Sequence, residues 1–133
     1  MHRAVVTSAV LGGALFWATA PVAGQEDAPT VPSGLVLHLQ EIRLDDASEG
    51  GVVRFRYVAD GLTGAAYDRV EGDFAALCEG QVLPWAAGQG DRPGQAIISL
   101  ASSAVDFGVS APDVTQYFEA FRLEEGRCIW EMF

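Results

Sequence analysis

The chain has 133 residues and a formal net charge of −10 at neutral pH, because 18 acidic residues outnumber eight arginines. This length fits one domain, and the negative charge argues against binding to nucleic acid or anionic lipid. Large cofactor-dependent folds are also excluded, since the chain is too short for them and lacks a glycine-rich phosphate-binding loop, so we expect no cofactor.

The first 24 residues have the three parts of a cleavable secretory signal. Residues 2–3 are a short basic start, residues 4–17 form an uncharged and mostly apolar stretch, and residues 18–24 are mostly small. This order is typical of a signal peptide. The apolar stretch is shorter than the roughly 20 residues of a membrane-spanning helix, so a cleaved signal is favoured over an uncleaved anchor.

We predict cleavage after Gly24, with Ala20 and Ala23 as alternative sites. Cleavage would leave seven arginines against 18 acidic residues, a net charge of −11. Residues 25–34 are polar and contain two prolines, so a flexible leader is expected there. Residues 35–133 then form the single folded domain, in the periplasm of a Gram-negative bacterium or secreted, with no stable membrane insertion after cleavage.

A β-hairpin is expected at the start of this domain. Residues 35–46 alternate apolar and polar side chains, but the parity of the apolar positions changes between Leu39 and Ile42. One extra residue near Gln40 would restore a common face, which is what a β-bulge does. Residues 52–59 form the second strand, and the turn between the strands is rich in Asp and Gly.

The middle of the chain changes to a helical period. Tyr67, Val70, Phe74 and Leu77 form one apolar stripe at helical spacing. We expect the helix to end near Cys78, with Gly80 stopping it.

Three strands should complete the fold. Residues 95–101 form one strand, and residues 115–123 and 127–133 form a second hairpin that turns at residues 124–126. The predicted fold is therefore α+β: a single domain of about five mostly antiparallel strands in ββαβββ order, with one helix packed on one face of the sheet.

Cys78 and Cys128 are the only cysteines in the chain. Export would deliver them to an oxidising compartment, where an even count favours a disulfide. The alternatives are two buried free thiols or a redox-active pair, and the Cys-x-x-Cys spacing that favours the redox role is absent.

Several segments together carry a resemblance to a known family. They are residues 31–34 (VPSG), 74–78 (FAALC), 97–100 (IISL), 106–108 (DFG), 115–122 (TQYFEAFR) and 126–131 (GRCIWE). On these segments the chain resembles a family of small exported bacterial proteins defined only as a domain of unknown function. The resemblance implies export and a Cys78–Cys128 disulfide, and it implies no activity.

One candidate binding patch is basic. Its residues should share the polar side of the first hairpin: His38, Arg43, Arg54 and Arg56. Guanidinium groups suit carboxylate and phosphate ligands. In so acidic a chain, however, we expect the arginines to pair with Glu119, Glu131 or acidic residues of the helix.

A second candidate is a polar site of Asp106, Glu119 and Arg122. A triad of Ser99, His38 and Asp106 is not favoured, because no Gly-x-Ser-x-Gly motif surrounds the serine.

No metal site is expected. A zinc site needs three or four ligands, and His38 is the only histidine outside the signal. The acidic turn at residues 45–49 lacks the spacing of a calcium-binding loop.

No acid–base or nucleophile constellation is recognisable, so we expect a non-catalytic binding or accessory module, with a periplasmic protein, an envelope component or a small ligand as its partner. The alternative is a small hydrolase or lyase that uses Asp106 or Glu119 with Arg122. A deep pocket that holds two or more of these charged groups would favour the enzyme, whereas a flat or filled sheet face would favour the binding module.

Overall fold

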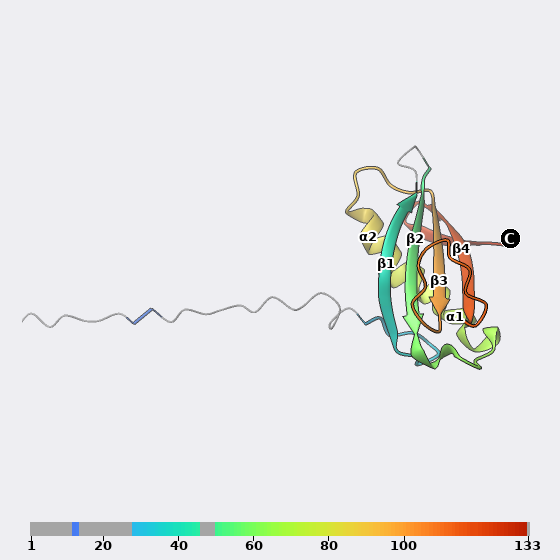
Figure 1. The fold of residues 1–133 in the computed structure, drawn as a ribbon. Helices are drawn as coiled ribbons and strands as arrows, with labels where there is room; N and C mark the ends of the chain where they lie inside the picture. Colours follow the sequence, from blue (N-terminus) through green and yellow to red (C-terminus); the bar gives the residue numbers. More distant parts are fainter. Residues whose placement is uncertain (1–11, 14–27, 46–49, 133) are drawn as a thin grey trace, which may run out of the picture.

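One five-stranded sheet organises the part of the chain that the computed structural model describes, residues 12–13, 28–45 and 50–132. The strands lie side by side in chain order, and only β2 and β3 run parallel (Figure 1). The strands are β1 (Leu37–Asp45), β2 (Val52–Ala59), β3 (Gln95–Ala101), β4 (Gln116–Glu124) and β5 (Arg127–Glu131).

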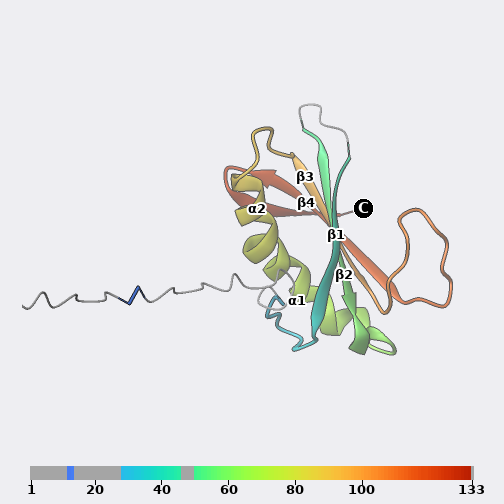
Figure 2. The same cartoon turned by 60° about the vertical axis from the view of Figure 1, so that its left-hand side comes forward.

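A single helical segment connects the two parallel strands, which cannot be joined by a tight turn. It follows a short 3-10 turn, η1 (Asp60–Leu62), and consists of α1 (Tyr67–Leu77), a π-helical turn η2 (Cys78–Val82) and α2 (Leu83–Ala87). The segment packs on one face of the sheet, and a long loop after β3 lies on the other (Figure 2). The predicted α+β class and ββαβββ order are confirmed.

The predicted β-bulge lies in β1. The pairing register with β2 shifts between Leu39 and Glu41, so one extra residue is accommodated there. As a result Leu37, Leu39 and Ile42 all lie on the face that carries the helix. Residues 46–49, in the turn that follows, lie outside the described residues.

The hairpin of β4 and β5 turns tightly at Glu125 and Gly126. Both residues have positive φ, 52° and 69°. Two consecutive residues with positive φ are typical of a type I′ turn, whose twist matches that of the flanking strands. The turn predicted at residues 124–126 is therefore confirmed.

The sequence suggested that the helix stops at Gly80, but in the structure it continues beyond this residue. The Leu83 amide donates to the Cys78 carbonyl, five residues back, and the helical path continues to Ala87. One glycine costs a helix only about 1 kcal/mol relative to alanine. Burial of Val82 and the edge-on packing of Trp85 against Phe55, at 5.6 Å between ring centroids, favour continuation.

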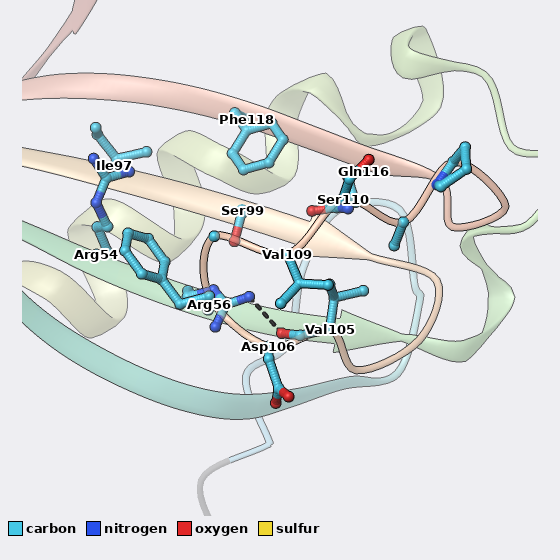
Figure 3. Close-up of a pocket in the computed structure, with 14 residues that line it drawn as sticks. Arg54, Arg56, Ile97, Ser99, Val105, Asp106, Val109, Ser110, Gln116 and Phe118 are labelled. Carbon is cyan, nitrogen blue, oxygen red and sulfur yellow. Dashed lines mark hydrogen bonds between the residues drawn. The ribbon is translucent and has the colours of Figure 1, made fainter.

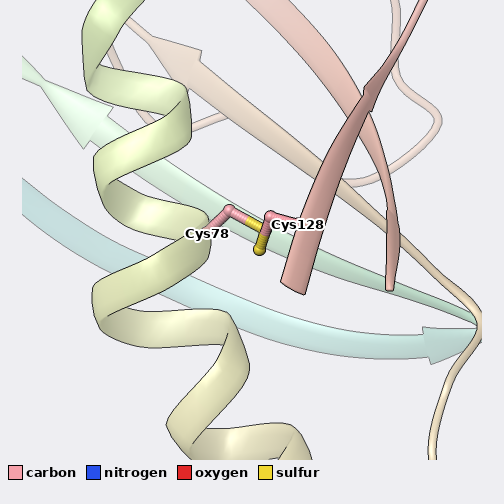
Figure 4. Close-up of a disulfide and its surroundings, with 2 residues drawn as sticks. All are labelled: Cys78 and Cys128. Atoms are coloured by element: carbon pink, nitrogen blue, oxygen red, sulfur yellow. A yellow bond between two sulfur atoms is a disulfide. The ribbon is translucent and has the colours of Figure 1, made fainter. Parts of the chain in front are cut away.

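Cys78 and Cys128 form a disulfide between the helical segment and β5, with their Cα atoms 6.3 Å apart (Figure 4). Cys78 begins the π-helical turn and is completely buried. The bridge therefore fastens the helix layer to the last strand of the sheet, as the resemblance implied.

The predicted flexible leader is wrong for residues 31–34. Val31 is only 5% exposed and belongs to the hydrophobic core. Ser33 donates two hydrogen bonds to Asp73 of α1, from its backbone amide at 2.9 Å and from its hydroxyl at 2.5 Å. Asp73 is itself fully buried, so this stretch of backbone is required to satisfy a carboxylate inside the fold.

The predicted signal peptide lies outside the described residues, apart from residues 12–13. Within the described ranges, no helix has both the length and the apolar character needed to cross a bilayer.

Candidate ligand-binding grooves on the two faces of the sheet

The face of the sheet opposite the helix carries most of the polar side chains of β1 and β2. Strand pairing places Glu41 beside Arg56, and Arg43 beside Arg54, on this face. Ser99 of β3 and Phe118 of β4 continue the row across the sheet. We call this surface the open face.

Residues 102–115, which we call the Ω-loop, fold over the open face. The loop is closed at its base, where the Ser102 amide donates to the Thr115 carbonyl at 2.9 Å and the Thr115 amide donates to the Ser102 hydroxyl at 3.0 Å. A loop of this length with adjacent ends fits the Ω-loop class, which is frequently functional.

Two kinds of contact hold the Ω-loop against the arginines. The Val105 carbonyl accepts hydrogen bonds from Arg56 at 2.6 Å and from Gln40 at 3.0 Å. The Phe107 ring lies under three guanidinium groups, 4.1 Å from that of Arg43 and 5.4 and 5.5 Å from those of Arg54 and Arg56. Cation–π contacts at such distances are attractive, so the basic patch itself positions the loop.

A groove of about 400 Å³ remains between the Ω-loop and the sheet, and we call it the loop groove (Figure 3). The polar side chains of the groove come from both the sheet and the loop, and the other lining residues are apolar or glycine: the polar ones are Arg54, Arg56, Ser99, Asp106, Ser110 and Gln116. The lining residues are Arg54, Arg56, Ile97, Ser99, Val105, Asp106, Phe107, Gly108, Val109, Ser110, Ala111, Pro112, Gln116 and Phe118.

The arginines pair with acids of β1 and not with the partners that the sequence suggested. Arg54 forms an ion pair with Asp45 at 2.7 Å, and both Arg56 and Arg43 pair with Glu41. Neighbouring strands bring these side chains together on one face. The expected partners lie elsewhere, because Glu119 and the helix are on the opposite face and Glu131 is on β5.

His38 shares the open face with the three arginines but does not line the loop groove. It lies opposite Val58, which pairs with Ala101, whereas Ser99 pairs with Arg56. Two strand spacings, about 10 Å, separate the two strands that carry His38 and Ser99. The triad that the sequence analysis disfavoured is not assembled.

The predicted polar site of Asp106, Glu119 and Arg122 is not brought together either. Asp106 belongs to the Ω-loop, and its carboxylate points away from Ser99 (Figure 3). Glu119 lies on the helix-covered face. Arg122 is half exposed and pairs with Glu124 at 2.9 Å. Residues of one strand share a face only when they are an even number of positions apart, so Glu119 and Arg122 lie on opposite faces of the sheet.

The described residues contain no cluster of three or more His, Cys, Asp or Glu that could hold a metal ion. Two members of the acidic turn, Asp46 and Glu49, lie outside those residues.

A second groove, which the sequence analysis missed, lies between α1 and the strands β4 and β5. Its volume is about 190 Å³, and we call it the aromatic groove. Its lining residues are Tyr67, Glu71, Phe74, Ala75, Glu119, Phe121 and Trp130.

Glu119 is the central polar group of the aromatic groove. It is 8% exposed and accepts hydrogen bonds from the Tyr67 hydroxyl and, at 2.5 Å, from the Trp130 indole. The hydrogen bond to Glu119, reinforced by burial and by the charges of Glu119 and Glu71, raises the pKa of Tyr67 to about 12. The sequence contained a signal that could have identified this groove. Glu119 is a charged residue at a core-facing position, between Tyr117 and Phe121 in an alternating strand.

Comparison with known proteins places the chain in a family without assigning an activity. The model of DUF6497, a family of unknown function, matches residues 13–133. No curated protein matches the chain, and no solved structure matches it.

Proposed function

Because the chain belongs to DUF6497, a family of unknown function, we propose a function from its own geometry: a non-catalytic binding domain that holds a small organic carboxylate in the loop groove. The observation that carries this proposal is the groove itself, which is roofed by the Ω-loop and has Arg54 and Arg56 in its wall. Its volume of about 400 Å³ lies in the range of small-molecule sites.

The surroundings of the loop groove are far less negative than the rest of the chain. Three arginines balance three carboxylates, Glu41 and Asp45 of β1 and Asp106 of the Ω-loop, so the groove is neutral in a chain whose overall charge is −10. Guanidinium groups bind carboxylates with good geometry. The apolar residues Ile97, Val109 and Phe118 would contact the hydrocarbon part of the ligand.

The composition of the groove supports binding without catalysis. Of the three charged groups that the enzyme alternative requires, only Asp106 lines the loop groove. Ser99 is the one hydroxyl of the sheet among the lining residues, and no histidine of the described chain lines the groove beside it. A nucleophile without a base in reach is poorly activated.

We expect small organic carboxylates to bind the loop groove and their amides to bind at least tenfold more weakly. The protein would be titrated with carboxylate and amide pairs while backbone amide shifts of Ser99 and Gln116 are followed by NMR. Arg54→Gln should weaken carboxylate binding at least tenfold. Arg127→Gln is the matched control, because it removes the same charge from an exposed residue outside the groove.

Two results of this titration would contradict the proposal. One is equal binding of a carboxylate and its amide, and the other is equal loss of affinity in the two arginine variants. Chemical turnover of any tested compound would instead support the enzyme alternative.

We also propose that the chain is exported to the periplasm or secreted, with residues 1–24 as a cleaved signal. The support is the three-part pattern of the N-terminus and the disulfide, which persists in oxidising compartments. A periplasmic or envelope component would then supply the ligand.

Processing has a direct test. The intact mass of protein purified from the cell envelope should correspond to a chain that begins at Gln25, or a few residues earlier if Ala20 or Ala23 is the site. Full-length chain in the membrane fraction would contradict the signal peptide.

A further inference from the structure

The aromatic groove differs in chemistry from the loop groove and lies on the other face of the sheet. It combines four aromatic rings with two carboxylates, and none of its lining residues is basic. The α1 residues Tyr67, Glu71, Phe74 and Ala75 are spaced so that they share one helix face. That face lies opposite Glu119, Phe121 and Trp130 of the sheet, which completes the groove.

The carboxylate of Glu119 has two hydrogen-bond donors but no cationic partner. Tyr67 and Trp130 are both neutral donors, and no arginine of the described residues forms an ion pair with Glu119. Moving a carboxylate out of water is unfavourable unless an opposite charge accompanies it. The groove therefore has a site of negative potential at its base.

The opening of the groove is aromatic. Trp130 is 54% exposed, although it lies on the helix-covered face of β5 and pairs with the buried Phe121. Tyr67 packs against Phe74 with ring centroids 6.3 Å apart. Exposed indole surface beside a buried carboxylate favours a ligand that is both apolar at its surface and positively charged.

Among cations, a quaternary ammonium ion fits this groove best. Each oxygen of Glu119 already accepts a hydrogen bond, so a primary ammonium ion would find too few acceptors for its three donors. A quaternary ammonium ion has no donor to satisfy, and aromatic faces attract it through cation–π contact. The volume of about 190 Å³ equals roughly six water molecules, enough for an ion the size of choline.

We propose that the aromatic groove binds a small, free quaternary ammonium ion through its aromatic rings and the Glu119 carboxylate. This inference goes beyond the function proposed above, because it concerns another site and a ligand of opposite charge. The two can fail independently of each other.

The test is an NMR titration of the purified, ¹⁵N-labelled protein with choline. The indole resonance of Trp130 should shift saturably, whereas that of Trp85, which packs against Phe55 outside the groove, should not. Choline should bind at least tenfold more tightly than 3,3-dimethylbutan-1-ol, a neutral molecule of the same shape. It should also bind more tightly than ethanolamine, a primary ammonium ion.

Variants separate recognition from a structural role of these residues. Glu119→Gln and Trp130→Leu should each weaken choline binding at least fivefold. Leu44→Ala is the matched control, since it removes an exposed apolar side chain of β1 that lines neither groove, and it should leave the affinity unchanged. Glu71→Gln, at an exposed position of α1, should weaken binding about twofold and serves if Glu119→Gln does not fold.

Three results would overturn the proposal: no saturable shift of Trp130, binding of the neutral alcohol as tight as that of choline, or equal shifts of both indoles. Sedimentation with phosphatidylcholine vesicles in the absence of a choline-induced shift would assign the groove to a lipid head group and likewise overturn it.

Discussion

Replacing both cysteines with alanine is expected to lower the free energy of unfolding by about 4 kcal/mol. The two cysteines are 50 residues apart in the sequence, and the chain-entropy estimate for closing such a loop has this size. A domain of this length has a total stability of about 5–15 kcal/mol, so the loss is a large fraction. Chemical denaturation of Cys78→Ala/Cys128→Ala beside the parent protein measures it.

Reduction of the parent protein is the matched control, because it breaks the same bond without changing the side chains. The reduced parent and the double variant should therefore unfold at similar denaturant concentrations. Two titratable thiols in the denatured, unreduced parent would contradict the disulfide, and an unchanged unfolding midpoint in the variant would contradict its importance.

The loss of stability in the double cysteine variant should be concentrated at β5. This strand is at the edge of the sheet and pairs only with β4, so the disulfide is its link to the helix layer. Trp130 lies two residues beyond Cys128 and lines the aromatic groove. Hydrogen exchange should therefore become faster over β5 than over β2 or β3 in the variant, and the aromatic groove should lose its outer wall.

Local patterns in the sequence were sufficient for most of the fold. The parity change between Leu39 and Ile42 predicted the bulge in β1, and the residues Glu125 and Gly126 marked a tight turn. Both features depend on residues within one hairpin. The prediction that the helix stops at Gly80 was wrong because it used a local signal alone. Burial of Val82 and Trp85 against the sheet, which depends on distant parts of the chain, outweighed that signal.

The sites were harder to predict because their partners are distant in the sequence. Tyr67 and Glu119 are 52 residues apart, and Arg56 lies 49 residues from the carbonyl of Val105 that it binds. The arginine side of the first hairpin was predicted correctly from alternation. That the Ω-loop would fold over it could not be inferred, because the segment has neither helical nor strand periodicity.

Buried Asp73 is the clearest case of a polar residue whose role appears only in three dimensions. It lies on α1 between apolar core residues and is fully buried. Its two carboxylate oxygens accept separate hydrogen bonds from Ser33, one from the backbone and one from the side chain. Residues 31–34, which the sequence suggested were part of a flexible leader, therefore belong to the folded unit.

A chain that begins at Leu35 should be less stable than one that begins at Ala28 by about 3–5 kcal/mol. The shorter chain loses Val31 from the core and leaves Asp73 buried without either donor, and removing one partner of a buried charged group has a cost of this size. Thermal and chemical unfolding of the two chains measure the difference. If both unfold at the same midpoint, residues 28–34 contribute nothing to stability, which would contradict their packing.

Point substitutions isolate the hydrogen bonds from the loss of apolar surface. Ser33→Ala should cost about 2 kcal/mol, because it removes the hydroxyl donor and leaves one buried oxygen of Asp73 unsatisfied. Ser103→Ala is the matched control at an exposed position and should change stability by less than about 0.5 kcal/mol. In the double variant Ser33→Ala/Asp73→Asn, the two effects should be strongly non-additive, since both substitutions disrupt the same contact. Additive effects would show that Ser33 and Asp73 contribute to stability separately.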